Sequence, residues 1–303
     1  MRTLVLTIGL VGCLSGVLAQ EKRPGLLIVD GKGKEHAVQS WKFTAGVREM
    51  SWLAPPAKAK PATPKDGEAK RPVPRPTGPL AFEFREENST NFVNGIVTLI
   101  PLAHLEELAF DDENQTVTAK VAGPADAEPI VLKGSTKYRG INKVAIEVEI
   151  PRGDMGIASV TFRGGVPNGI QRVKLLSAKP AAPVKPPAIT LVAADENKSV
   201  HKVSDLKVLY RDSDGRWQLS STLMFKKTLK VDLGKIKSLK ISREQADRCE
   251  VIFADGEELS LTLLKTVTLD DQRLLLEGLL ATVPAGYKLF PLHTVTTVQF
   301  NTE

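Results

Sequence analysis

Apolar and polar residues alternate with a period of two along many short stretches of this chain. Clear examples are Val117–Val121, Val144–Ile150 and Val295–Val298, which are rich in β-branched residues and predict half-buried strands. The Asp-Gly pairs 214–215 and 255–256 each separate two apolar runs and predict tight hairpins. No stretch keeps an amphipathic helical period for more than two or three turns. The pattern therefore predicts an all-β protein built of small sandwiches or barrels with short helical turns.

A second pattern places apolar residues at positions one, three, six, nine and eleven of an eleven-residue stretch. It occurs three times, at Ile100–Phe110, Val231–Ile241 and Phe290–Phe300. The central spacing of three predicts one short helical or 3₁₀ turn between two strand ends. A fainter copy ends at Phe162, and we interpret it as the counterpart of the copy that ends at Phe300.

These copies indicate an internal duplication. The second copy begins 131 positions after the first, and an upstream set of four residues recurs at an offset of 165. That set consists of His36, Val38, Lys42 and Trp52, which recur as His201, Val203, Lys207 and Trp217. The offsets differ by 34 residues, of which an insertion at residues 54–79 supplies 26. We predict two homologous domains, 24–178 and 189–303, with a proline-rich linker at 179–188; chance recurrence of strand patterns is the alternative.

The N-terminus has the pattern of a secretory signal peptide. Arg2 precedes an apolar run from Leu4 to Val17, and small residues up to Ala19 predict cleavage there, so residues 1–19 would be removed. Residues 10–13 also match the lipobox of bacterial lipoproteins, which makes Cys13 the candidate lipidation site. We expect export to the periplasm or extracellular space, either free or anchored through Cys13, with no transmembrane helix after processing.

The formal net charge of +6 is concentrated in two proline-rich segments. Residues 54–79 carry +4 and residues 179–188 carry +2, so the rest of the mature chain is near −1. We therefore expect no nucleic-acid partner. Eight prolines predict a disordered insertion at 54–79, whose basic side chains suit contact with anionic lipid or wall polymer. A passive exposed loop is the alternative.

Removal of Cys13 would leave Cys249 as the single cysteine, so no intramolecular disulfide is expected. Extracellular animal domains usually carry disulfides, and this favours a bacterial cell envelope. Cys249 lies in an apolar run, so we predict a buried structural residue rather than a nucleophile.

Motifs for catalysis and metal binding are missing from the sequence. A hydrolytic serine in a Gly-x-Ser-x-Gly turn does not occur, and the four histidines are scattered singly. The run Asp212–Gly215 begins like a calcium loop but lacks the downstream glutamate, so we predict a hairpin turn. We expect no catalytic residue, no bound metal and no cofactor.

Two carboxylates were the best candidates for catalysis. Glu147 and Glu277 occupy similar places in the two halves, and a carboxylate pair is the machinery of glycoside hydrolysis. Because charged side chains are rarely buried, we predict that both face solvent instead, as Glu149 would beside Glu147.

One loop is the best candidate for binding. Lys137, Tyr138 and Arg139 offer an aromatic ring between two cations, which suits a sugar, a phosphate or a carboxylate. An ordinary polar hairpin tip is the alternative. The three tryptophans, Trp41, Trp52 and Trp217, are predicted to lie in the core.

Together these features favour an exported, non-catalytic interaction or structural protein of a bacterial cell envelope, with a protein or cell-wall partner. The alternative is an exported protein that binds a sugar or an anionic ligand through the Tyr138 loop or the cleft between the halves. A hydrolase is the third hypothesis. The sequence leaves the oligomeric state open.

Overall fold

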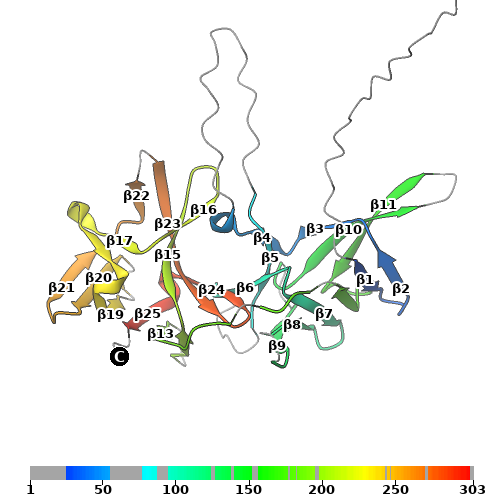
Figure 1. Cartoon of the computed structure of the whole chain (residues 1–303), viewed down its shortest axis with the longest axis horizontal. Helices are drawn as coiled ribbons and strands as arrows, with labels where there is room; N and C mark the ends of the chain where they lie inside the picture. Colours follow the sequence, from blue (N-terminus) through cyan, green and yellow to red (C-terminus); the bar gives the residue numbers. More distant parts are fainter. Residues whose placement is uncertain are drawn as a thin grey trace, which may run out of the picture.

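The computed structural model describes twelve stretches of the chain. These are residues 25–54, 77–86, 95–123, 127–137, 140–151, 156–176, 178–181, 183–194, 198–242, 244–245, 247–269 and 272–300. The predicted signal peptide with Cys13, and residues 55–76 of the proline-rich insertion, lie outside them. All regular elements in the described stretches are β-strands or single 3₁₀ turns, as Figure 1 shows, which confirms the all-β prediction. Within these stretches the structure has no helix long and apolar enough to cross a membrane.

The first half of the chain forms a six-stranded antiparallel sheet in the order β2-β1-β12-β7-β8-β9. Its strands are β1 (Leu26–Val29), β2 (Glu35–Val38), β7 (Leu105–Asp111), β8 (Thr116–Val121), β9 (Ile130–Ser135) and β12 (Arg172–Leu175). A three-stranded sheet, β11-β10-β3, packs its buried residues against those of the larger sheet. It contains β3 (Trp41–Ala45), β10 (Val144–Pro151) and β11 (Ile157–Gly164).

The second half forms another six-stranded antiparallel sheet, in the order β14-β13-β25-β19-β20-β21. Its strands are β13 (Ile189–Ala193), β14 (Val200–Val203), β19 (Ile236–Ile241), β20 (Arg248–Phe253), β21 (Glu258–Thr262) and β25 (Val295–Phe300). The two six-stranded sheets have the same topology. Across the sheets, β2-β1-β12-β7-β8-β9 matches β14-β13-β25-β19-β20-β21 strand by strand.

An eight-stranded sheet runs through both halves. Its main path is β16-β15-β23-β24-β6-β5-β4, and β22 pairs with β23 beside that path. The strands are β4 (Val47–Glu49), β5 (Leu80–Phe84), β6 (Val97–Pro101), β15 (Leu206–Arg211), β16 (Trp217–Ser220), β22 (Thr266–Leu269), β23 (Gln272–Val283) and β24 (Gly286–Pro291). The halves meet where β24 pairs with β6, with Tyr287 opposite Leu99. A separate hairpin joins β17 (Thr222–Met224) to β18 (Lys230–Asp232).

The three eleven-residue copies share one local structure, a strand, a tight turn and a second strand. The turns are η5 (Leu233–Lys235) between β18 and β19, and η6 (Leu292–Thr294) between β24 and β25. In the first copy the backbone N–H of His104 donates to the carbonyl of Pro101 at 2.9 Å, between β6 and β7. The predicted turn is confirmed, and in each copy it carries the chain from one sheet into another.

The fainter copy has a different place in the fold. Phe162 lies in β11 of the three-stranded sheet, whereas Phe300 lies in β25, and β12 occupies the position that corresponds to β25. The predicted pairing of Phe162 with Phe300 is therefore wrong. The assignment failed because any half-buried strand shows the same period of two, whichever sheet it joins.

Three buried clusters form the core. One belongs to the first half and one to the second, and each draws residues from a six-stranded sheet and from the strands packed against it. Two residues cross over, because Ile96 packs in the second cluster and Ala285 in the first. The third cluster lies where the halves join and contains Met50, Ala81, Val97, Leu99, Leu209, Trp217, Leu280 and Leu289, with Trp52 and Tyr287 against it.

Both ends of the predicted linker are hydrogen-bonded to the sheets. The N–H of Lys179 donates to the carbonyl of Ala103 at 2.7 Å, and that of Ala188 donates to the carbonyl of Val203 at 3.1 Å. One end of residues 179–188 is thus fixed to the first half and the other end to the second.

Candidate functional site

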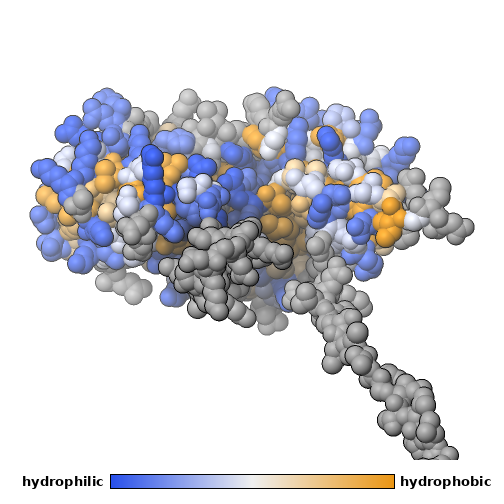
Figure 2. Space-filling model, turned by 90° about the horizontal axis from the view of Figure 1, so that it is seen from above, coloured by the Kyte–Doolittle hydropathy of each residue, from blue (hydrophilic) through white to orange (hydrophobic). Residues whose placement is uncertain are grey.

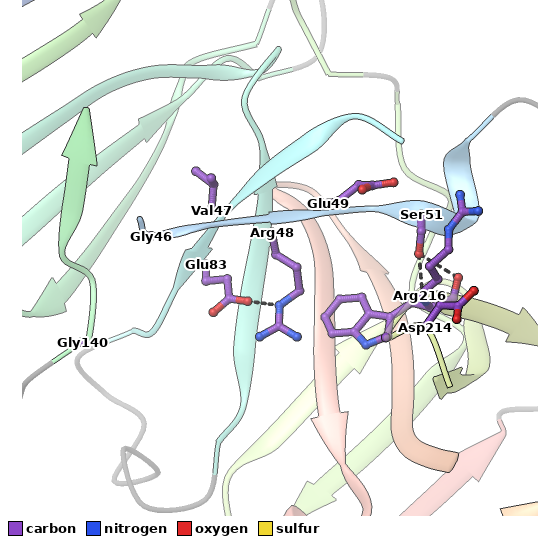
Figure 3. Close-up of a pocket in the computed structure, with 11 residues that line it drawn as sticks. Gly46, Val47, Arg48, Glu49, Ser51, Glu83, Gly140, Asp214 and Arg216 are labelled. Atoms are coloured by element: carbon purple, nitrogen blue, oxygen red, sulfur yellow. Dashed lines mark hydrogen bonds and ion pairs between the residues drawn. The ribbon is translucent and has the colours of Figure 1, made fainter. Parts of the chain in front are cut away.

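A cavity of about 520 Å³ lies at the junction of the two halves. Its walls come from β4, the 3₁₀ turn η1 (Ser51–Leu53) and β5 on one side, and from the turn between β15 and β16 on the other (Figure 3). Segments far apart in sequence thus build one hollow. Its charged side chains are Arg48, Glu49, Glu83, Asp214 and Arg216.

Arg48 occupies the middle of the cavity wall. Its Nε forms an ion pair with Glu83 on the neighbouring strand, and its guanidinium carbon lies 4.4 Å from the ring centroid of Trp217 (Figure 3). The ring of Trp217 stacks on that of Trp52, with 5.5 Å between centroids and 25° between planes. A cation over an aromatic face is attracted by the ring quadrupole, so Arg48 links the first half to Trp217 of the second.

The side chain of Ser51 in the first half is hydrogen-bonded to the backbone of Trp217 in the second half. Its Oγ accepts the N–H of Trp217 at 2.6 Å and donates to the carbonyl of the same residue at 2.9 Å. The hydroxyl proton is therefore already used, and the described lining of the cavity contains no histidine to act as a base. This arrangement suits a structural role for Ser51 rather than nucleophilic attack.

The turn between β15 and β16 is held by Asp212. Its Oδ1 accepts the N–H groups of Asp214 at 3.0 Å and of Arg216 at 2.8 Å, and Gly215 adopts a φ of +80° that favours glycine. The predicted hairpin turn is confirmed. It presents the side chains of Asp214 and Arg216 at the cavity (Figure 3).

The cavity offers cationic donors and anionic acceptors side by side. Two arginines and three carboxylates line it, and the carboxylate of Glu49 accepts the N–H of Gly78 at 2.8 Å. Such a mixed lining can bind a polar group or a chain segment that carries both donors and acceptors. Sequence reasoning missed these residues because strand pairing brings them together from distant segments. The recurrence of Trp52 and Trp217 was the one signal that pointed to the region.

The predicted binding loop reaches the same place at one end. Lys137 is exposed, and its backbone N–H donates to Ser135 Oγ at 3.1 Å. Tyr138 and Arg139 lie outside the described residues, but Gly140, the next residue, lines the cavity. Of this loop, the described residue Gly140 thus belongs to the cleft between the halves.

The two candidate carboxylates lie in different sheets and have different partners. Glu147 of β10 forms an ion pair with Lys42 at 2.8 Å and accepts the hydroxyl of Ser159 at 2.8 Å, and these bonds lower its pKa. Glu277 of β23 forms an ion pair with Arg211. Each carboxylate is engaged by its own cation, an arrangement of a solvent-facing ion pair.

Two further candidate groups, Cys249 and His36, are a buried thiol and an imidazole paired with a carboxylate. Cys249 is 1% exposed in β20, and burial raises the pKa of its thiol to about 12, so the prediction of a buried residue is confirmed. His36 Nε2 lies 2.9 Å from the carboxylate of Asp30. Within the described stretches, His, Cys, Asp and Glu form no group of three or more that could hold a metal ion.

Trp41 and Trp217 are buried as predicted, at 9% and 4% exposure, whereas Trp52 is half-buried at the junction. Comparison of the chain with protein-family models, with curated proteins and with solved structures yields no match.

Proposed function

We infer that the two halves are homologous tandem domains, each a small β-sandwich. The shared order of the six-stranded sheets supports this, as does the order β11-β10-β3, which corresponds to β24-β23-β15. A side-chain contact agrees with both. The ring of His36 lies 5.1 Å from that of Phe162, and the ring of His201 lies 5.2 Å from that of Phe290.

We propose that the protein is an exported, non-catalytic interaction or structural protein of a bacterial cell envelope, and that it binds part of a protein or cell-wall partner in the junction cavity. The observation that carries this proposal is the cavity itself, which both halves build and in which ionic side chains are already held by the fold. A preorganised polar lining reduces the entropy lost on binding. The signal-peptide pattern of residues 1–19 supports export.

An exported receptor for a sugar or an anion is the second candidate. Arg48 and Arg216 line the cavity, and so does Gly140, which follows Lys137, Tyr138 and Arg139 in the sequence. A small ligand of this kind would saturate the isolated protein, whereas a macromolecular partner would be retained from envelope material.

The experiment is an affinity capture from envelope extract with the exported protein as bait. A double variant, Asp214→Lys with Arg216→Glu, reverses two charges at the cavity. Asp255→Lys is the matched control, because Asp255 also precedes a glycine of positive φ, in the turn between β20 and β21. We expect the wild type and the control to retain the same partner and the double variant to lose it.

Equal retention by all three proteins would exclude the cavity as the binding site. Retention no greater than that of an unrelated exported protein would contradict the interaction role, and saturable binding of a soluble sugar or anion would favour the second candidate.

A further inference from the structure

One strand in each half, β11 and β18, has an open edge among the described strands, and the counterparts of these two strands, β24 and β6, pair with each other. β11 and β24 correspond, because each pairs with the strand, β10 or β23, that lies beside β3 or β15. β6 and β18 correspond as well. An eleven-residue copy begins within each of these strands. Ile100, the first residue of one copy, pairs with Phe82, and Val231, the first residue of the other, pairs with Leu223.

Inside the chain these two kinds of strand bind one another. β24 of the second half pairs with β6 of the first, with Tyr287, Lys288 and Leu289 opposite Leu99, Thr98 and Val97. The counterpart strands have no such neighbour within the described stretches: β11 is the last strand of its sheet, and β18 pairs with β17 alone. Unpaired N–H and C=O groups on a strand edge can bind another strand.

We propose that β11 of one molecule pairs antiparallel with β18 of a second copy of this chain, repeating between molecules the junction of β24 with β6. The contact is heterologous, because it joins two different surfaces. The two edges lie toward opposite ends of the molecule, with β11 at one end and β17, the partner of β18, near the other (Figure 1). One molecule therefore binds a copy at each end, and the copies form a head-to-tail chain.

The register of the internal junction predicts which residues meet. Ser159 corresponds to Tyr287 and Lys230 to Leu99, so Ser159 lies opposite Lys230, and Val160 lies opposite Leu229. Leu229 is 39% exposed, and pairing covers it with another apolar side chain.

The charges on the two edges are complementary. Glu149 of β10 is exposed and lies directly opposite Ser159, and Lys230 of the added strand comes next in the same row across the sheet. In the view of Figure 2 the surface is mostly hydrophilic, with hydrophobic residues exposed in separate patches. On that face the molecule offers small patches rather than one broad apolar surface to a partner.

This inference rests on the proposed duplication and not on the junction cavity. Capture of a partner by the cavity and pairing of copies through β11 and β18 use different residues, so either can fail while the other holds. We expect the double variant Asp214→Lys with Arg216→Glu to self-associate as the wild type does.

The test is disulfide crosslinking between two variants of the exported protein that each gain one cysteine, Ser159→Cys and Lys230→Cys. Residues directly opposite in antiparallel strands are close enough for a disulfide. The native cysteines do not interfere, because either processing route leaves Cys13 without a free thiol and Cys249 is buried. Each variant is oxidised with copper phenanthroline, alone and mixed with the other, and the products are separated by size without reducing agent.

We expect the mixture to form a crosslinked dimer and each variant alone to form none above the wild-type level. A chain with both substitutions should form a ladder of dimers, trimers and longer products. Val131→Cys, on the exposed edge strand β9, replaces Ser159→Cys in the control mixture and should not crosslink. Leu229→Lys, added to Lys230→Cys, should lower the dimer yield at least about tenfold, because it places a charged side chain opposite Val160 in place of an apolar one.

A dimer yield in the Ser159→Cys and Lys230→Cys mixture no greater than in the Val131→Cys mixture would overturn the proposal. Crosslinking of Ser159→Cys with itself would also overturn it, because that product requires a symmetric contact.

Discussion

The two halves of the molecule use the same strand order but treat one strand differently. In the second half, β24 has a neighbour on each side, β23 and β6, and Phe290 at its end is fully buried. In the first half, β11 has β10 alone among the described strands, and its side chains alternate between exposed and half-buried up to Gly164. The junction between the halves is thus an extension of a sheet, whereas β11 of the first half has one edge without a partner among the described strands.

The halves also differ in how their polar groups are buried. In the first half, His36 is hydrogen-bonded to a surface carboxylate, Asp30, which also accepts the N–H groups of Lys32 and Lys34. The second half buries a phenol, Tyr210, at 1% exposure, with its hydroxyl donating to the carbonyl of Thr222 at 3.1 Å. Asp30 therefore contributes to acid dependence of stability in the first half, and Tyr210 to alkaline dependence in the second.

The largest effect is expected at the junction. Trp217→Ala removes a 4%-exposed side chain together with its stacking on Trp52 and its contact with Arg48. It should lower the free energy of unfolding by about 3–5 kcal/mol in denaturant titration. Trp52→Ala, at a half-buried position, should cost less, and the double variant should cost less than the sum because the rings share one contact. Strict additivity would contradict the stacked arrangement.

A matched pair of phenylalanines compares the two strands directly. Phe290→Ala should lower the free energy of unfolding by about 3–5 kcal/mol, because this side chain is fully buried. Phe162→Ala should lower it by only about 1–2 kcal/mol, since its ring is half-buried on a strand with an open edge. Denaturant titration of both variants checks this, and equal losses would show that β11 is as well covered as β24.

Tyr210→Phe should cost about 1 kcal/mol, the net value of one hydrogen bond, and should change the alkaline stability. Burial raises the pKa of Tyr210 from 10.0 to about 12, so the unfolded chain ionises at lower pH than the folded one. Folding stability therefore falls as the pH rises above about 10. Thermal unfolding between pH 8 and 11 should show a shallower decline in the variant, and identical slopes would contradict the assignment.

The smallest effect is expected at Asp30. The hydrogen bond with His36 and the backbone bonds lower the pKa of Asp30 from 3.8 to about 2. A lowered folded-state pKa stabilises the fold above the unfolded value, and this contribution is lost as the pH falls from about 4 to about 2. Asp30→Asn should remove that part of the acid dependence of thermal unfolding. Glu35→Gln, at an exposed residue of the adjoining strand, is the control and should leave the acid profile unchanged.

The strands and tight turns could be predicted, because they depend on residues that are close together in the sequence. The strands at 117–121, 144–150 and 295–298 and the two Asp-Gly hairpins could be read because the period of two and the glycine requirement are local. The strand, turn and strand of the eleven-residue copies could be read for the same reason.

Long-range pairing was not predictable. β24 and β6 are apolar strands that satisfy the same pattern as many others, so nothing in their composition selects one partner. The cavity followed from that pairing, and Arg48, Glu83 and Asp214 therefore carried no signal of a shared site. Phe162 was assigned to the wrong counterpart for the same reason, since its period of two describes a strand and not its sheet.

The most direct test of the central comparison is residue-resolved amide hydrogen exchange of the protein without residues 1–19, at a series of concentrations. In dilute solution we expect slow exchange throughout β24 and fast exchange for the β11 amides that point away from β10. Those β11 amides, and the outward amides of β18, should become protected together as the concentration rises. Equal protection of β11 and β24 in dilute protein would contradict the open edge of β11. β11 amides that stay unprotected while the molecules associate would contradict its pairing with β18 of another copy.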